Sequence, residues 1–190
     1  MNRSELEHII RAACAITNQE NVVIIGSQAI LASFDNSVLS EDTTLSVKAD
    51  VFFLDDEDGS LSDLVDGTIG ELSPFQFTHG IYAHGVGENT AILPDGWKER
   101  LVVLRNANTE YSSGLCLDPY DLCVAKLFAY RENDLSYVRS LLDAGLIKLP
   151  ELRQRVDLVT ITPELEEKAR VVAAYLTKFG DETGLFIKTI

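Results

Sequence analysis

The stretch from Asn21 to Leu31, NVVIIGSQAIL, decides the fold expected for this chain. Its four consecutive β-branched residues predict a short strand that is buried on both faces. Gly26 and Ser27 end that strand, and residues 28–34 are predicted to form a short helix. A glycine and a serine at such a junction suit phosphate binding, because the backbone can come close, the hydroxyl can donate and the first N–H groups of the helix are free. The same pair is also common in strand–helix turns that bind nothing.

Helices and strands are predicted to alternate on both sides of this stretch. A capping-box pattern, S-x-x-E, in which Ser4 and Glu7 would each satisfy a free N–H group, predicts a helix before the strand. Downstream, the apolar patterns predict a strand at residues 45–54, a helix at 60–72, a hairpin of residues 80–83 and 90–93, and a strand at 100–105.

The last third of the chain is predicted to be helical. Asp118 and Pro119 are a strong start signal, and the helix that they begin is expected to run to about Arg131, with three more helices after it. The predicted class is therefore α/β (α+β). Residues 1–112 are expected to form an α/β core, and residues 113–190 a C-terminal helical layer packed on that core as one structural unit.

The composition of the 190 residues is that of a globular protein. Apolar residues make up 46% and charged residues 24%, which argues against wholesale disorder. No apolar run approaches the roughly 20 residues that span a bilayer, and Met1 opens directly into polar sequence, so we expect a cytoplasmic protein without membrane association or export signal. The formal net charge of −14 argues against broad nucleic-acid binding, which needs a positive face. It does not argue against a nucleotide held locally with a metal ion.

Several stretches resemble known nucleotidyltransferases. The chain resembles the polymerase-β-type superfamily in Val22 to Leu31, VVIIGSQAIL, and again in Ser46 to Phe53, SVKADVFF. Within that superfamily it is similar to proteins allied to the AbiEii-type toxins of abortive-infection and toxin–antitoxin systems. Their lysine and Arg-x-x-Asp helical segment resembles Asp121 to Leu142, DLCVAKLFAYRENDLSYVRSLL. The resemblance implies a small mixed sheet of nucleotidyltransferase type with flanking helices.

The resemblance also implies roles for particular residues. It gives Gly26 and Ser27 to phosphate binding, and Asp50 to a catalytic Mg²⁺ ion. In the superfamily, two carboxylates two residues apart on a strand face the same way and hold Mg²⁺ against a triphosphate. Here the first of these two positions is Lys48. An ammonium cannot ligate Mg²⁺, so Lys48 would either pair with Asp50 or place a positive charge where the cation should bind.

Lys126 lies on the predicted helix that follows Asp118, which is apolar nearly all round and is therefore expected to be buried. Its ammonium must reach a carboxylate, a cleft or a bound anion, because burying it unpaired is costly. One hypothesis places Lys126 and Arg131 in the nucleotide cleft, where both neutralise phosphate charge and Lys126 serves catalysis. The other places Lys126 at the surface or beside an acid such as Asp50. Arg131 and Asp134, three residues apart, are expected to form an ion pair.

Two other groups receive structural interpretations. The acidic run at residues 55–58 is expected to be a solvated turn that closes the second strand. His79 and His84 are five residues apart across predicted strand residues, so they would point to opposite faces, which argues against shared metal ligation.

Two hypotheses of function follow. The first is an enzyme that uses Mg²⁺ to transfer a nucleoside monophosphate from a nucleoside triphosphate to a protein or RNA acceptor, as the toxin-like member of a system with an antitoxin partner. In the second, the fold is kept while the metal site is lost, and the protein is a catalytically impaired binding or regulatory module. Lys48 favours the second hypothesis. Both require that Ser27, Asp50 and Lys126 meet at one cleft.

Overall fold

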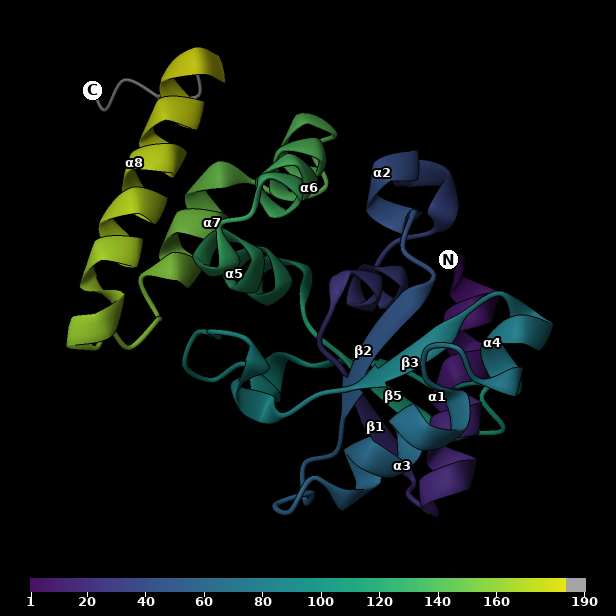
Figure 1. Ribbon diagram of the computed structural model, residues 1–190. Coiled ribbons are helices and arrows are strands. Elements are labelled where there is room, and N and C mark those ends of the chain that lie inside the picture. The colour runs from purple at the N-terminus through teal and green to yellow at the C-terminus, as the bar shows by residue number, and fades with distance from the viewer. Residues whose placement is uncertain (184–190) are drawn as a thin grey trace.

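In the computed structural model, which describes residues 1–183, the chain folds around a five-stranded mixed sheet (Figure 1). The mixed α/β class expected from the sequence is confirmed. The strand order is β3-β2-β1-β5-β4. The strands are β1 (Asn21–Ile24), β2 (Lys48–Phe52), β3 (Tyr82–Gly85), β4 (Val102–Leu104) and β5 (Ser113–Cys116).

Strand β1 is the centre of the sheet. It pairs in antiparallel fashion with β2, with Val23 opposite Phe52, and in parallel with β5, with Val23 opposite Leu115. Strand β1 has a neighbour on each side and a helix packed on it, and its apolar residues from Val22 to Ile24 are almost completely inaccessible. The run of β-branched residues before Gly26 therefore forms the buried strand that it predicts.

Three helices pack on or beside the sheet near the N-terminus. They are α1 (Arg3–Thr17), α3 (Ser60–Ile69) and α4 (Pro74–His79), of which α1 contacts β1 and α3 contacts β3. Helix α1 begins two residues earlier than its predicted capping box. The Asn2 side chain caps the helix by accepting a hydrogen bond from the Glu5 N–H. The Glu5 carboxylate in turn accepts one from the Asn2 N–H. Glu7 is buried instead, and its carboxylate accepts hydrogen bonds from the side chains of Asn106 and Asn108, both at 2.8 Å.

The segment after β1 folds into short pieces. The predicted helix at residues 28–34 is the 3₁₀ helix η1, and the remaining short elements lie in the connections to β2, β4 and α8. These elements are η1 (Ser27–Ala32), η2 (Asn36–Val38), α2 (Glu41–Thr44), η3 (Glu88–Thr90), η4 (Lys98–Arg100) and η5 (Pro163–Leu165).

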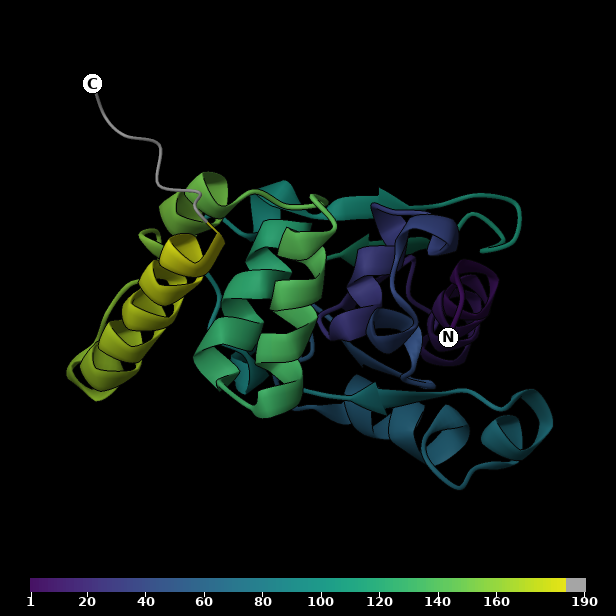
Figure 2. The same cartoon turned by 90° about the horizontal axis from the view of Figure 1, so that it is seen from above.

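The last third of the described chain forms a helical layer beside the sheet (Figure 2). Its members are α5 (Pro119–Ala129), α6 (Glu132–Asp143), α7 (Leu149–Val156) and α8 (Glu166–Thr183). Asp118 caps α5 by accepting a hydrogen bond from the Tyr120 N–H, as the sequence predicts. Helix α5 packs on η1 with one side and on α6, α7 and α8 with the others, so it joins the helical layer to the sheet.

A buried ionic network fixes α5 to its surroundings. The carboxylate of Asp121 has no exposed surface and accepts hydrogen bonds from Arg100, at 2.9 Å from its Nε atom, and from Arg155. Arg100 lies just before β4 and also donates to the Asp95 carbonyl, while Arg155 lies on α7. The network therefore links the sheet side of the molecule to two helices of the helical layer.

The predicted hairpin of residues 80–83 and 90–93 is wrong. Strand β3 lies parallel to β2 at the edge of the sheet, and residues 90–93 are in no strand. Residues 88–90 form the 3₁₀ helix η3 in place of a returning strand, and β3 follows the helix α4, which Ser73 caps, Pro74 begins and Gly80 ends with a φ of 73°. The sequence analysis also missed β5, which belongs to the sheet although it follows residue 112. Within residues 1–183, no helix is both long and apolar enough to span a membrane.

Candidate functional site

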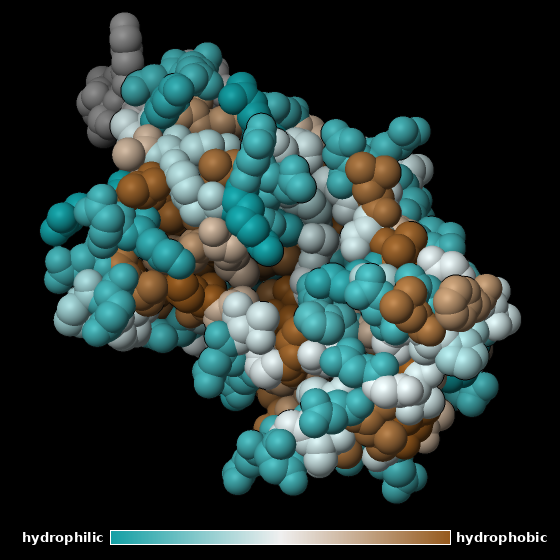
Figure 3. Space-filling view, viewed as in Figure 1, coloured by the Kyte–Doolittle hydropathy of each residue, from teal (hydrophilic) through white to brown (hydrophobic). Residues whose placement is uncertain are grey.

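A cleft of about 1000 Å³ lies between the sheet and the helical layer. Figure 3 shows the molecule hollowed between these two parts, with apolar side chains at the base of the hollow. One wall is formed by the end of β1, the Gly26–Ser27 turn, β2 and β3, and the opposite wall by α5 and α6. Ser27, Asp50 and Lys126 all line this cleft, so the geometric condition shared by both hypotheses of function is met.

The turn after β1 lies directly against Asp50. The N–H of Ile25 donates to the Asp50 carbonyl at 3.0 Å, which continues the pairing of β1 with β2 up to the turn. A Cβ atom at Gly26 would collide with the Asp50 carboxylate, at its Oδ2 atom. Any larger residue at position 26 would therefore displace the Asp50 side chain, and this close approach places the turn and the carboxylate side by side.

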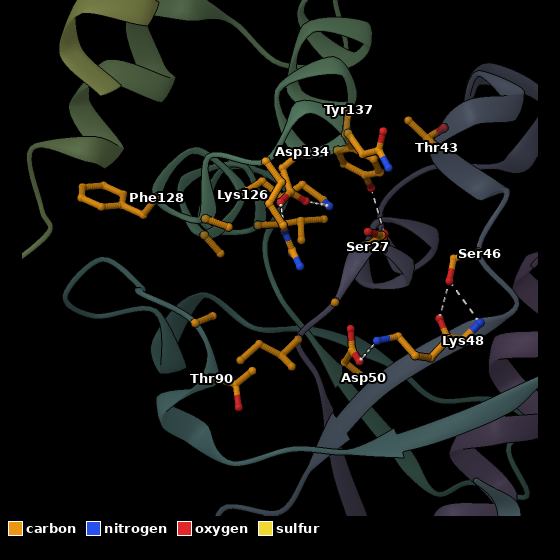
Figure 4. Close-up of a pocket in the computed structure, with 18 of the residues that line it drawn as sticks. Ser27, Thr43, Ser46, Lys48, Asp50, Thr90, Lys126, Phe128, Asp134 and Tyr137 are labelled. Atoms are coloured by element: carbon orange, nitrogen blue, oxygen red, sulfur yellow. Dashed lines mark hydrogen bonds and ion pairs between the residues drawn. The ribbon is translucent and has the colours of Figure 1, made fainter. Parts of the chain in front are cut away.

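Asp50 is held by two nitrogen donors. Its Oδ1 atom is 2.8 Å from Lys48 Nζ, and the two side chains point the same way because the residues are two apart on β2 (Figure 4). The same oxygen is 3.0 Å from His84 Nδ1, and His84 stands opposite Asp50 in the register of β2 with β3. The predicted pairing of Lys48 with Asp50 is confirmed. The contribution of His84 was missed, because β3 was assigned to a hairpin.

Lys126 projects from the opposite wall, and its side chain is 11% exposed. Its Nζ atom lies 2.9 Å from Asp134 Oδ1 and 4.2 Å from the centre of the Tyr137 ring (Figure 4). Arg131 Nε approaches the other oxygen of Asp134, Oδ2, to 2.6 Å, as the expected ion pair requires. The acid that pairs with Lys126 is thus Asp134 on α6, whereas the sequence offered Asp50 as one example of such an acid.

The pKa of Asp134 reflects this position between two cations. Burial alone would raise the pKa of the carboxyl group, but hydrogen bonds and charges from Lys126 and Arg131 outweigh it, so the pKa lies below its usual value. Asp134 is therefore ionised at neutral pH and holds both basic groups at the edge of the cleft.

Tyr137 connects the two walls. Its hydroxyl donates a hydrogen bond of 2.8 Å to the backbone carbonyl of Ser27, while its ring faces Lys126 (Figure 4). Burial raises the pKa of Tyr137 well above its usual value, so the phenol stays neutral and remains a donor. One side chain of α6 thereby fixes both the backbone of the turn and the lysine opposite it.

The charge of the cleft differs from that of the whole chain. The protein carries a formal net charge of −14, yet four basic side chains and three acidic side chains line the cleft. The basic ones are Lys48, Lys126, Arg131 and Lys168, and the acidic ones are Asp42, Asp50 and Asp134. The acidic turn at residues 55–58 does not line the cleft, and Asp56 instead caps the start of α3 by accepting from the N–H groups of Leu61 and Ser62. The cleft lining thus carries a small excess of basic side chains, in contrast to the chain as a whole.

The residues present do not suit a Mg²⁺ ion held at Asp50. Mg²⁺ takes near-octahedral oxygen ligands, and one or two carboxylates normally supply the protein share. Asp50 supplies one carboxylate, whose Oδ1 atom is already bound to an ammonium and an imidazole, and Lys48 occupies the position two residues earlier. In the part of the chain that the structure describes, no group of three or more His, Cys, Asp or Glu side chains could hold a metal ion. The donor set therefore matches an anion more closely than a cation.

Comparison with known proteins identifies the family. Residues 4–181 match the family described as nucleotidyltransferases of unknown function (DUF6036), and the chain therefore belongs to it. This finding confirms the nucleotidyltransferase-like resemblance, whereas the affiliation with AbiEii-type toxins stays a prediction. The chain matches no curated protein and no solved structure.

Proposed function

We propose that this chain is a nucleotide-binding protein built on the nucleotidyltransferase fold, and that its cleft holds the phosphate groups of a nucleoside triphosphate. One observation carries the proposal. A glycine–serine turn and four basic side chains from both walls surround one cleft in a protein that is otherwise strongly acidic. Such a local concentration of donors attracts an anion of several charges.

The phosphate groups would lie between the two walls. In this arrangement the Ser27 hydroxyl and the backbone beside Gly26 contact phosphate from the sheet, and Lys126 and Arg131 contact it from the helices. Both basic groups are bound to Asp134, yet an ammonium has three donors and a guanidinium five, so each retains donors for a ligand. The side chain of Arg131 is 77% exposed and can turn toward a bound anion at little cost.

The nucleoside would occupy the apolar part of the cleft. Helix α5 contributes Leu122, Ala125 and Ala129 there, and the segment after β3 contributes Ala91 and Ile92. Apolar surfaces of this kind accept the flat face of a base, while the charged groups bind the phosphates at the other end. A nucleotide would thus match both the charged and the apolar residues that line the cleft.

A binding or regulatory role fits the contacts of Asp50 better than transfer does. The carboxylate that would hold Mg²⁺ in a transferase is paired with Lys48 at 2.8 Å. Transfer of a nucleoside monophosphate to a protein or RNA acceptor, in a toxin–antitoxin or abortive-infection system, is the second candidate, and membership in a nucleotidyltransferase family favours it. It predicts pyrophosphate release, which a coupled assay with each nucleoside triphosphate measures.

Arg131 offers a clean test of the binding site. We expect the full-length protein to bind a nucleoside triphosphate in calorimetry and to melt at a higher temperature in its presence. Arg131→Ala should weaken binding by about tenfold or more, since a charged hydrogen bond contributes about 1.5–3 kcal/mol. Arg139→Ala is the matched control, because Arg139 lies on α6, which Arg131 immediately precedes, pairs with Asp143 and does not line the cleft. Equal binding by both variants, or no binding of any nucleotide to the wild type, would refute the proposal.

A further inference from the structure

We propose that the cleft binds its nucleotide without a divalent cation, and that the Lys48 ammonium takes the place of that ion beside Asp50. This inference rests on the nucleotide-binding function proposed above and specifies the form of the ligand. The ligand would be the free nucleotide anion, whereas a transferase of this fold takes the magnesium complex.

The surroundings of Asp50 leave no suitable place for a second cation. Its Oδ1 atom lies within hydrogen-bond distance of Lys48 Nζ and His84 Nδ1, and its Oδ2 atom packs over Gly26. An ion bound to either oxygen would therefore lie close to an ammonium, and like charges at such a distance repel strongly. To admit the ion, Lys48 would have to leave its partner.

Lys48 is in addition well placed to serve as the cation itself. Its side chain is 36% exposed and lines the cleft, so the ammonium is not enclosed by its partner. Asp50 occupies one of its three N–H donors, and the Ser46 hydroxyl bonds only to the Lys48 backbone. The remaining donors of Nζ are free to reach phosphate oxygens of a ligand that also contacts Ser27.

The other basic groups supply the rest of the positive charge. Lys126 and Arg131 face the same cleft from the helices, and Lys168 joins them from α8. Within residues 1–183, no carboxylate lies at ion-pair distance from Lys168, so its charge is not offset there. Although Asp50 and Asp134 offset part of this charge, all four basic side chains can donate to phosphate oxygens, a role that a bound metal otherwise shares.

Metal dependence of binding is the decisive measurement. Titrate the full chain by calorimetry with each of the four common nucleoside triphosphates, once in excess EDTA and once in excess magnesium chloride. We expect binding in EDTA, and binding several-fold weaker in magnesium, because the magnesium complex carries two fewer negative charges. Binding in magnesium alone would overturn this inference and leave the nucleotide-binding function intact. Binding in neither condition would instead overturn the nucleotide-binding function, and this inference with it.

Substitution of Lys48 tests the residue directly. Lys48→Glu restores a pair of carboxylates, so its binding in EDTA should fall by about tenfold or more, and magnesium should now strengthen binding. Lys48→Gln removes the charge alone and should lose about tenfold in EDTA without a gain from magnesium. Circular dichroism and thermal melting verify that each variant folds. Wild-type affinity of both variants in EDTA would contradict the inference.

Lys98 provides the matched control for these substitutions. It is half-exposed like Lys48 and pairs with Glu88 at 2.7 Å, but it does not line the cleft. Lys98→Glu and Lys98→Gln change the net charge by the same amounts, so they should alter affinity less than about twofold in either condition, because exposed charges outside a site are screened. A loss as large as that of the Lys48 variants would show that only the total charge matters.

Discussion

Asp121→Asn is expected to destabilise the protein strongly, since it removes a fully buried charge from between two guanidinium groups. Breaking a buried ion pair by removing one partner costs about 3–5 kcal/mol. Arg100 and Arg155 keep 26% and 20% of their side-chain surface exposed, and asparagine retains one acceptor oxygen, so the lower limit applies. We therefore expect the free energy of unfolding to fall by about 3 kcal/mol, and the melting temperature to fall by about 6–12 °C for a chain of this size.

Urea denaturation followed by circular dichroism measures this difference, with thermal melting as a second assay. Asp143→Asn is the control, because Asp143 pairs with Arg139 at 3.5 Å while both side chains are about half exposed. Exposed pairs contribute about 0–1 kcal/mol, so this variant should remain close to wild type. If Asp121→Asn lost less than about 1 kcal/mol, the buried carboxylate would not be what fixes α5 between β4 and α7, and the reasoning would be wrong.

Three further predictions concern the cleft. Tyr137→Phe removes the hydrogen bond to the Ser27 carbonyl and keeps the ring, so urea denaturation should show a loss of about 1 kcal/mol, and nucleotide affinity should fall several-fold. Gly26→Ala should destabilise the protein by about 1–3 kcal/mol in the same assay, because the added methyl group collides with Asp50. The lowered pKa of Asp134 means that its contribution is complete above the unfolded pKa of about 4 and is lost as the pH falls through the folded value. Asp134→Asn should therefore show a smaller drop in stability than wild type on acidification, and an equal drop would refute this assignment.

The parts of the fold that the sequence predicts are those determined by local chemistry. The run before Gly26 forms β1, and Asp118 with Pro119 begins α5. Strand β5 was missed because its residues, SGLC, lack the β-branched pattern of a strand. Its glycine, Gly114, packs directly against Ile10 of α1, where a Cβ atom would collide. A small residue at position 114 lets helix α1 pack closely on β5, and the sequence pattern alone does not reveal this packing.

In the candidate site, the sequence likewise predicts the contacts that depend on local spacing and misses those that depend on topology. The spacing of Lys48 and Asp50 on one strand is sufficient to predict their ion pair. The partner of Lys126 depends on the turn at Tyr130, whose left-handed φ of 55° ends α5 and lets α6 return alongside it. Likewise, His84 reaches Asp50 only through the register of two strands that are distant in the sequence. Contacts of this kind depend on how the helices and strands are arranged, so they cannot be predicted from the chemistry of the individual residues.

The position of β5 has a consequence for biosynthesis. Strand β1 emerges from the ribosome early, but its parallel neighbour follows only with residues 113–116. Until then one edge of the most apolar strand has no partner, and pairing across so long a stretch of chain is slow. An unprotected edge of this kind readily joins other chains. This edge of β1 is therefore covered only once residues 113–116 have been synthesised.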